Sequence, residues 1–255
     1  MDRDNGVQLQ REAVAGSVTT FAAGTAEGRL LRLDGVTAAI NPGCAQRSIV
    51  NSATYRDAAA LAGALPELAR EYADAGIAAH AIWSVEPSAD ALVVLEDAGY
   101  VLDSEPAGMT LELASDFDAD PGELDWDAEG TPQEAGQVND RAYGYPEGEG
   151  VAGAIGDAPP GMPMRTYRAR VDGEVAAVLR TFDVGTDCHV GWVATLPEHR
   201  GKRLASGLMA AALADARDRG LRSSTLQASM LGRGVYERLG YRVVCRLQLH
   251  EKRET

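Results

Sequence analysis

The sequence is poor in cysteine and contains no long apolar run. Its cysteines, Cys44, Cys188 and Cys245, are odd in number and lack the spacing of a metal site or a disulfide framework. No uninterrupted apolar segment approaches the roughly 20 residues that cross a bilayer, and the first residues have no signal-peptide pattern. These absences predict reduced thiols in a soluble, cytoplasmic protein that uses neither a metal nor a membrane.

Basic residues are scarce in the first half of the chain. The net charge is −14; residues 1–120 hold 7 basic and 19 acidic side chains, whereas residues 121–255 hold 17 and 19. Because nucleic-acid affinity comes largely from neutralising phosphates, a chain this acidic is not expected to bind nucleic acid. The basic charge of the second half is available for a more local anion.

Hydrophobic periodicity in the first half predicts alternating helices and strands. At 255 residues and 45% apolar content, the chain can form one large domain or two ordinary ones. Asp57 can cap a helix, because Leu61, Leu65 and Leu68 follow at helical spacing before Gly76. The expected helices are 9–22, 57–76 and one that starts at Pro87; the expected strands are 28–33, 36–40, 48–50, 77–83 and 109–113.

An acidic segment separates the two halves. Residues 116–129 contain seven acids without periodicity, so residues 116–130 are predicted to be a solvated linker that begins near Ser115. Thr131 to Glu134 resembles a capping box, and a Gly/Pro-rich loop over 145–163 is a candidate substrate wall. The expected strands are 164–171, 174–182, 188–195, 224–228 and 241–250; the expected helices are 131–143, about 203–220 and 231–239.

One stretch of the second half combines the features of an anion site. An apolar strand over 190–196 is followed by a glycine-containing turn and a helix that begins near Arg203. The first turn of a helix leaves backbone N–H groups without partners and carries the positive end of the macrodipole. Arg200, Lys202 and Arg203 add positive charge, so the stretch predicts a polyphosphate ligand.

This stretch resembles the pyrophosphate loop of the GNAT superfamily, the acyl-CoA-dependent N-acyltransferases. The loop of that family reads Arg/Gln-x-x-Gly-x-Gly/Ala, and residues 200–205 match it at the first and last positions. Arg203 stands where the pattern has its first glycine, and Gly201 supplies part of the lost backbone freedom. The resemblance implies that acetyl-CoA binds to Arg200, Gly201, Lys202, Arg203, Leu204, Ala205 and the backbone of Val193, Ala194 and Thr195.

A second motif follows at the usual spacing of the family. Residues 226–241 are similar to the GNAT strand, helix and closing Leu-Gly-Tyr. The resemblance implies that Tyr236 lies near the coenzyme sulfur and serves as general acid, which suits a phenol that titrates near 10. The alternative is a core tyrosine on an amphipathic helix. Ser229 occupies a place where many members have an asparagine that contacts the coenzyme.

His189 is the candidate base that would deprotonate the amine. It lies four residues before Val193 and hence on the same face of the strand. Some GNAT members carry a carboxylate at that position, and an unperturbed imidazole titrates near 6.5. The alternatives are a histidine that only makes structural hydrogen bonds and an amine that loses its proton to a chain of waters.

The two halves end alike. Residues 91–100 and the strand at 111–113 parallel residues 234–241 and the strand at 247–249. This pattern predicts an internal repeat whose first copy is a degenerate GNAT-like domain without a phosphate loop. The predicted fold is α/β: a degenerate domain at 1–115 and a catalytic domain at 131–255, each a mixed, largely antiparallel sheet flanked by helices.

Together these features predict an acetyl-CoA-dependent N-acetyltransferase. Its acceptor would be a primary amine of a small molecule or peptide, and the chain would act as a monomer or homodimer without metal, nucleic acid or membrane. A non-catalytic acyl-CoA-binding sensor or interaction module is the alternative, motivated by Arg203 in the loop and by the degenerate first half.

Overall fold

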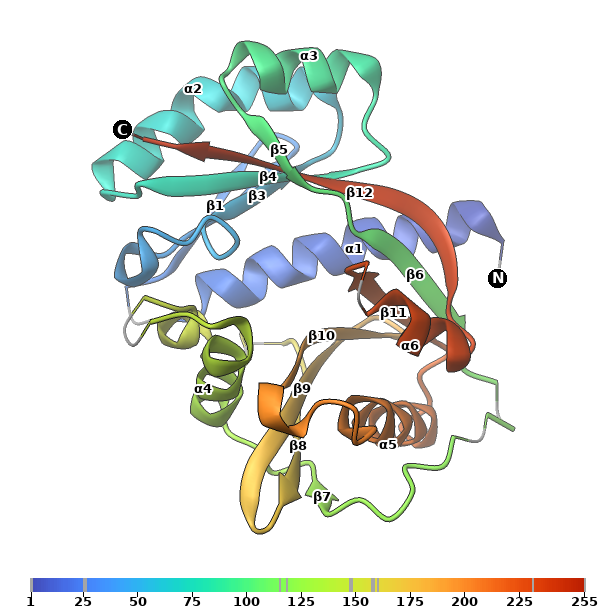
Figure 1. The fold of residues 1–255 in the computed structure, drawn as a ribbon. Helices are drawn as coiled ribbons and strands as arrows, with labels where there is room; N and C mark the ends of the chain where they lie inside the picture. Colours follow the sequence, from blue (N-terminus) through green and yellow to red (C-terminus); the bar gives the residue numbers. More distant parts are fainter. Residues whose placement is uncertain are drawn as a thin grey trace.

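The chain folds around one long twisted sheet. The computed structural model describes residues 2–24, 27–114, 116–117, 119–146, 149–156, 159, 161–230 and 232–254. Within these residues the strands join in the order β1-β2-β3-β4-β12-β6-β11-β10-β9-β8-β7, and β5 pairs with β12 (Figure 1). Within the same residues, no helix combines the length and the apolar character that crossing a bilayer requires.

The elements of the first half are α1 (Arg3–Ala22), β1 (Arg29–Leu33), β2 (Val36–Ile40), η1 (Pro42–Cys44), β3 (Ser52–Tyr55), α2 (Ala58–Asp74), β4 (Ala79–Val85), α3 (Ala89–Asp97), β5 (Val101–Ser104) and β6 (Ala107–Glu112). Those of the second half are β7 (Trp126–Asp127), α4 (Pro132–Tyr143), η2 (Ala152–Ala154), β8 (Met164–Val171), β9 (Glu174–Val184), β10 (Asp187–Thr195), η3 (Pro197–His199), α5 (Leu204–Asp218), β11 (Ser223–Ala228), α6 (Arg233–Arg238) and β12 (Arg242–Arg253).

The predicted internal repeat is confirmed by the topology. From α1 to β4 and from α4 to β11, each half runs helix, three strands, helix, strand. The three strands pair antiparallel in both halves, and the third strand pairs parallel with the fourth, as β3 with β4 and β10 with β11. The predicted α/β fold with two similar halves and a mixed, largely antiparallel sheet is therefore the observed one.

The two halves exchange strands at the centre of the sheet. The start of β12 pairs with β6, as Arg242 with Thr110, and its remainder pairs with β4, as Leu247 with Val85. Strand β6, from the first half of the sequence, also pairs along β11 of the second half. Figure 1 shows β12 in red running from the lower part of the sheet to the upper part. Each half thus completes the sheet of the other, an arrangement that the predicted boundaries at 115 and 131 do not contain.

Helix α1 packs across this junction. It contacts β2 and β3 of the first half and β9, β11 and β12 of the second. Val14 packs against Cys245 and Leu247, while the Gln10 side-chain amide donates to the carbonyl of Met109 over 2.7 Å. Because a buried amide must find acceptors, Gln10 fixes the helix to the exchanged strand. Helix α1 therefore belongs to both halves.

Separate helices cover the outer parts of the sheet. In the first half, Leu61, Leu68 and Tyr72 of α2 pack in a buried cluster with sheet residues such as Ile40 and Ile82. In the second half the corresponding cover is α5, whose buried residues include Leu208, Met209 and Leu213. All three cysteines of the chain are buried and free.

Several element boundaries differ from the predictions. Residues 48–50 form turns, because the Asn51 N–H donates to the carbonyl of Ser48 and its side-chain amide donates to the carbonyl of Cys44; the strand begins later, at Ser52. Helix α3 starts at Ala89 and not at Pro87, since the hydroxyl of Ser88 caps it by accepting from the Ala91 N–H. Strand β5 was not predicted. The expected start of the last helix, Leu231, lies outside the described residues.

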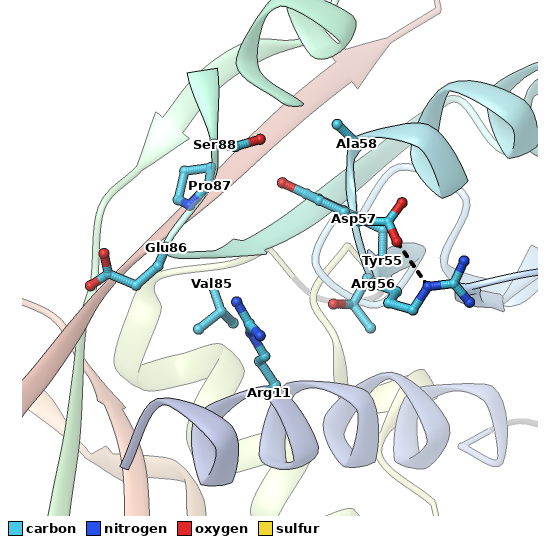
Figure 2. Close-up of a pocket in the computed structure, with 10 residues that line it drawn as sticks. Arg11, Tyr55, Arg56, Asp57, Ala58, Val85, Glu86, Pro87 and Ser88 are labelled. Carbon is cyan, nitrogen blue, oxygen red and sulfur yellow. Dashed lines mark hydrogen bonds and ion pairs between the residues drawn. The ribbon is translucent and has the colours of Figure 1, made fainter. Parts of the chain in front are cut away.

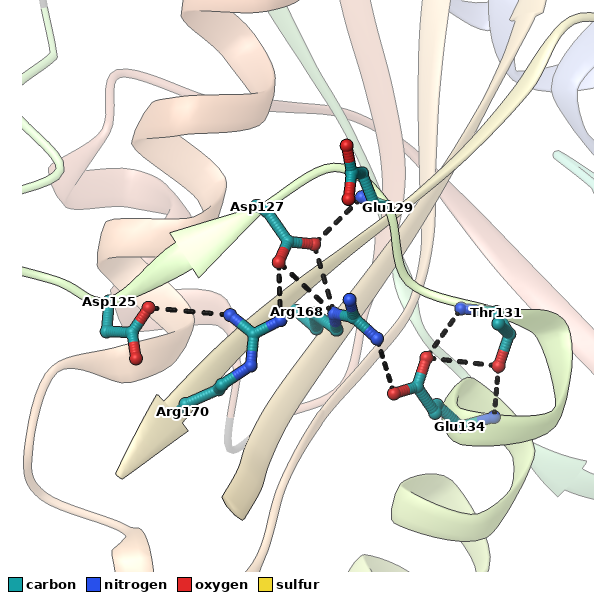
Figure 3. A network of polar contacts seen from close by, with 7 residues as sticks. All are labelled: Asp125, Asp127, Glu129, Thr131, Glu134, Arg168 and Arg170. Carbon is teal, nitrogen blue, oxygen red and sulfur yellow. Dashed lines mark hydrogen bonds and ion pairs between the residues drawn. The ribbon is translucent and has the colours of Figure 1, made fainter. Parts of the chain in front are cut away.

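The end of the predicted linker is bound to the second half. Strand β7 pairs with β8, and Asp127 accepts hydrogen bonds from Arg168 and Arg170 of that strand (Figure 3). Arg168 also donates to Glu134, whose other oxygen completes the predicted capping box with Thr131. These contacts correct the expectation of a fully solvated linker at its carboxyl end. Ser115 and Asp118, at its beginning, lie outside the described residues.

Candidate functional site

Strand β10 leaves its parallel neighbour halfway along its length. It pairs with β11 from Asp187 to Val190, while its pairing with β9 continues to Thr195. The register with β9 shifts between Gly191 and Ala194, and Trp192 within this bulge has φ of 51°. A bulge bends a strand and disturbs its ladder. The backbone around residue 193 therefore lies beyond the last residue of β10 that pairs with β11.

The turn after β10 leads into the start of α5, which no side chain caps. Residues 197–199 form η3, after which Gly201 and Arg203 both have positive φ, 80° and 62°. Arg203 is the N-cap of α5, and no side chain caps the helix. The N–H groups of its first turn are the ones that a helix leaves without intrahelical partners, and they attract anions. This geometry fits a phosphate ligand.

The basic residues of the turn have different surroundings. Arg200 donates to the carbonyl of Ala142 over 2.6 Å and to that of Thr195 over 3.4 Å. Its guanidinium therefore ties the turn to the end of α4 as well as contributing charge. Lys202 is exposed, with its Nζ 3.1 Å from Nδ1 of His199. The predicted loop residues are thus brought together, but Arg200 is held mainly by backbone carbonyls.

Helix α6 places the predicted acid beside the end of β11. The hydroxyl of Ser229 accepts from the N–H of Gly232 over 3.2 Å at the start of the helix. Tyr236 is partly buried, and its ring lies edge-on to that of Tyr241 with centroids 6.1 Å apart. Burial, assisted by the nearby Tyr143, raises the pKa of Tyr236 to about 12. The phenol is therefore protonated at neutral pH and able to donate.

The structure gives His189 a buried, structural setting. Its side chain is 1% exposed, its Nδ1 lies 3.0 Å from the hydroxyl of Thr225, and its ring packs on Phe182. Burial lowers the pKa of His189 to about 3, with a hydrogen bond to Gln227 acting in the opposite direction. An imidazole without access to solvent cannot meet an incoming amine. The expectation that His189 is the base therefore loses its physical support.

A buried carboxylate anchors this histidine. Asp187 accepts hydrogen bonds from the hydroxyls of Ser223 and Thr225, each over 2.6 Å. Because the Thr225 hydroxyl donates to Asp187, its oxygen is left to accept from His189 Nδ1. Burial raises the pKa of Asp187 to about 6, although both hydroxyls oppose the shift. The network holds β10 and β11 together up to the residue at which they separate.

A cavity of about 410 Å³ lies between the start of α5 and α6. It is lined by Arg203, Ser206, Val235, Arg238 and Leu239. Sequence reasoning selected Arg203 but missed Arg238. The signal was present, because residues 235, 238 and 239 are spaced three and four apart and so share one face of a helix.

The first half has a smaller cavity at the corresponding position. Its volume is about 220 Å³, and it is lined by residues 54–58 and 85–88 together with Arg11 (Figure 2). The start of α2 is occupied by Asp57, which accepts from the Ala60 N–H over 2.9 Å and pairs with Arg56. A carboxylate there opposes a phosphate. The predicted lack of a coenzyme site in the first half stays a prediction.

Comparisons with known proteins agree with this geometry. The family model described as an acetyltransferase (GNAT) domain matches residues 165–244. A search of curated protein sequences finds no match. Within the described residues, no group of three or more His, Cys, Asp or Glu side chains is arranged to hold a metal ion.

Several solved structures are similar over most of the chain. A GCN5-related N-acetyltransferase from Kribbella flavida has a TM-score of 0.68 at 18% identity, with 96% of each chain covered. One from Sphaerobacter thermophilus has a TM-score of 0.56 at 17% identity, covering 88% of this chain and 82% of that one. A tandem GNAT protein of the clavulanic acid pathway has 0.57 at 14%, covering 98% and 95%. Because all three identities are below 25%, the likeness to these structures shows the fold alone.

Proposed function

We propose that the chain moves an acetyl group from acetyl-CoA to a primary amine, because residues 165–244 match the family model of the GNAT acetyltransferase domain. The observation that carries the proposal is the end of the β10–β11 pairing at Val190, followed along the chain by the uncapped start of α5. The proposal places the thioester beside the part of β10 that does not pair with β11, and the phosphates at the start of α5.

The residues of the turn fit the coenzyme. The N–H groups of Leu204 and Ala205 at the start of α5 are oriented for a pyrophosphate, and Lys202 adds an exposed positive charge. Arg200 keeps the turn in place through the Ala142 carbonyl. The backbone of Val193 to Thr195, beside the separation of the strands, is available for the pantetheine arm. Bound acetyl-CoA supplies an acyl group activated as a thioester.

Tyr236 supplies the proton that the reaction returns to sulfur. The amine nitrogen forms a bond to the acyl carbon, the carbon–sulfur bond breaks, and the thiolate takes the phenolic proton of Tyr236. The pKa of about 12 keeps that proton on the phenol until it is needed. The proton lost by the amine passes to solvent, which restores the phenol. His189 serves this site by fixing the adjoining strands.

The first half contributes a wall to the acceptor side. The loop after α4 is held by Asp140, whose carboxylate accepts from the N–H groups of Val151 and Ala152 over 2.8 and 3.0 Å. Arg47 of the first half lies over the ring of Tyr145 with 4.2 Å between guanidinium carbon and centroid. This loop is the one that sequence reasoning assigned to the acceptor. The proposal therefore gives the first half the role of supporting this loop, through the contact of Arg47 with Tyr145.

The second candidate is a non-catalytic acyl-CoA sensor, which the burial of His189 favours because it leaves the site without a titrating base. Turnover measured as free thiol from acetyl-CoA with a panel of primary amines separates the two. The proposal expects amine-dependent thiol release that Tyr236→Phe lowers and that Tyr72→Phe, in α2 of the first half, leaves unchanged. Binding of acetyl-CoA without thiol release from any amine would favour the sensor.

A further inference from the structure

Helix α1 of the first half places a buried amide against strand β11 of the second. Gln10 is 0% exposed, and its Nε2 donates to the carbonyls of Met109 and Leu226 over 2.7 and 3.2 Å. Its Oε1 accepts from the side-chain amide of Gln227 over 3.1 Å. Residue 108 leaves room for this amide because it is a glycine, whose added Cβ would lie 3.2 Å from the Gln10 Cδ. The side chain of Gln10 thus makes hydrogen bonds to both β6 and β11.

These bonds reach β11 at the place where β10 leaves it. Val190 and Leu226 are the last residues that the two strands pair, so Gln227 is the first residue of β11 beyond the pairing. Gln227 also shares a hydrogen bond with His189, the buried histidine of β10. Because a buried polar network whose bonds are all made holds its members in one arrangement, Gln10 fixes the direction in which β11 continues.

The other end of α1 contacts β10. Phe21 is 7% exposed, and its ring lies edge-on to that of Trp192, with centroids 5.6 Å apart and an interplanar angle of 83°. Trp192 belongs to the bulge of β10, beyond the pairing with β11. Phe21 follows Gln10 by eleven residues, or about three helical turns, so both side chains lie on one face of α1. One helix therefore contacts both strands just past the point where they separate.

We propose that Gln10 and Phe21 are positioning residues for acyl transfer, and that α1 thereby sets the placement of β10 relative to β11. The inference rests on the proposed function. In that function the backbone after Trp192 holds the thioester, whereas the proton donor Tyr236 lies on α6, the element that follows β11. The distance between sulfur and phenol then depends on two strand segments that no longer pair with each other. Because the phosphates bind at the start of α5, α1 governs the transfer step and not the coenzyme affinity.

The test compares kcat for thiol release with a primary amine and acetyl-CoA affinity from calorimetric titration. Gln10→Met keeps the approximate length of the side chain but removes its hydrogen bonds, and Phe21→Leu removes the ring contact. Each should lower kcat roughly 10- to 100-fold, because a misplacement of about 1 Å can cost a reaction that much. The affinity for acetyl-CoA should stay that of the wild type.

A second variant tests the bond between α1 and β11 from its other end. Gln227→Met should also lower kcat, and the double variant with Gln10→Met should lose no more than the more impaired of the two single variants, because the two side chains share one interaction. If Gln10→Met does not fold, Gln227→Met and Phe21→Leu decide the question. Circular dichroism at the assay temperature verifies that each variant is folded.

The matched control is Val14→Ala. Val14 lies one turn after Gln10 on the same helix, but it packs against Cys245 and Leu247 of β12. The lost packing should lower Tm, because a buried side chain has been truncated, and kcat should not change.

Hydrogen exchange gives a measurement that needs no activity. In Gln10→Met and Phe21→Leu, amides at 191–195 and 226–228 should lose protection, whereas those at 187–190, where β10 still pairs with β11, should keep it. Val14→Ala should show no such difference between the two sets of amides.

Wild-type kcat in the folded variants of Gln10, Gln227 and Phe21 overturns the proposal. An equally low kcat in Val14→Ala does so as well, since lost stability would then be the cause, and so does an equal loss of protection in both sets of amides. A wild type that binds acetyl-CoA and releases no thiol with any amine rejects the proposed function instead. Hydrogen exchange then still decides whether α1 positions the two strands.

Discussion

The exchanged strand β6 makes Gly108 a position on which both halves depend. Gly108 pairs with Gln227 of β11 on one side and with Cys245 of β12 on the other. A Cβ atom added there would lie 2.4 Å from the Cys245 sulfur, 2.7 Å from a Leu247 methyl group and 3.2 Å from Gln10. Gly108→Ala therefore forces β12 or α1 to move at the crossing of the two halves.

The magnitude follows from these distances. Two of the contacts, at 2.4 and 2.7 Å, are well inside a normal contact distance of roughly 3.5–4.0 Å, so the packing must shift. Overpacking of this kind costs about 1–3 kcal/mol. For a chain of this size each kcal/mol lowers Tm by roughly 2–4 °C, so we expect a decrease of about 2–12 °C.

Thermal unfolding measures the decrease, and amide hydrogen exchange assigns it to the two halves. Because β6 and β12 join the two halves of the sheet, amides of α2 and of α5 should lose protection by the same free energy in Gly108→Ala. The control is Gly63→Ala in α2, where no heavy atom lies within 4 Å of the added Cβ. Alanine is the better helix former, so the control should gain about 0.5–1 kcal/mol.

Two results would refute this reasoning. One is a Gly108→Ala variant with the Tm of the wild type, which would mean that the crossing tolerates another methyl group. The other is loss of protection in α5 alone, with α2 unchanged, which would mean that the halves unfold independently despite the exchanged strands.

The remaining predictions concern the site and the halves. Tyr236→Phe should lower turnover by roughly 10²–10⁴-fold with unchanged acetyl-CoA affinity, and a near-normal rate in this variant removes Tyr236 from the mechanism. Because the pKa of Tyr236 is raised to about 12, wild-type turnover should show no loss from ionisation of this phenol below pH 10. Because the pKa of His189 is lowered to about 3, its imidazole stays neutral in the folded protein and binds a proton in the unfolded one, so its stabilisation is present above pH 6.5 and lost toward pH 3. His189→Gln should therefore reduce the slope of the unfolding free energy against pH, between pH 6 and 4, by up to about 1.4 kcal/mol per pH unit. An unchanged slope contradicts the burial of His189. Titration should find one coenzyme per chain, because Asp57 occupies the start of α2, and a second equivalent site contradicts this. Residues 121–255 alone lack β6 and should associate through the uncovered edges of β11 and β12, which size-exclusion chromatography measures. A fragment that elutes as one monodisperse species and unfolds cooperatively would show that the exchange of strands between the halves is dispensable.

Much of the local structure could be predicted from the sequence. The strand at 36–40, the Asp57-capped helix, the capping box at Thr131 and the helix beginning at Leu204 were each confirmed within a residue or so. These features depend on side chains near one another in the sequence, such as a cap and the apolar periodicity that follows it. The turn at residues 200–205 is local in the same sense, because its charges and glycine lie within six residues.

The roles of individual polar side chains could not be predicted in the same way. On strand periodicity His189 faces the same side as Val193, but the bulge at Trp192 shifts the strand and Thr225 and Phe182 enclose the imidazole. Arg200 carries the charge expected of a phosphate ligand, yet its nearest acceptor is a carbonyl 58 residues earlier in the chain. Burial and hydrogen-bond partners belong to the packed structure, and a pattern of residue types does not contain them.

The sequence by itself determined that this protein consists of two similar α/β halves and that only the second has a basic, glycine-containing turn before a helix. It did so because periodicity, capping and loop composition are local. Only the tertiary structure decided that β6 and β12 cross between the halves, that the linker end is bound through Asp127, and that Arg203 and Arg238 line one cavity. Strand pairing and cavity lining join residues that are distant in the chain, since they depend on which surfaces become buried together when the sheet forms.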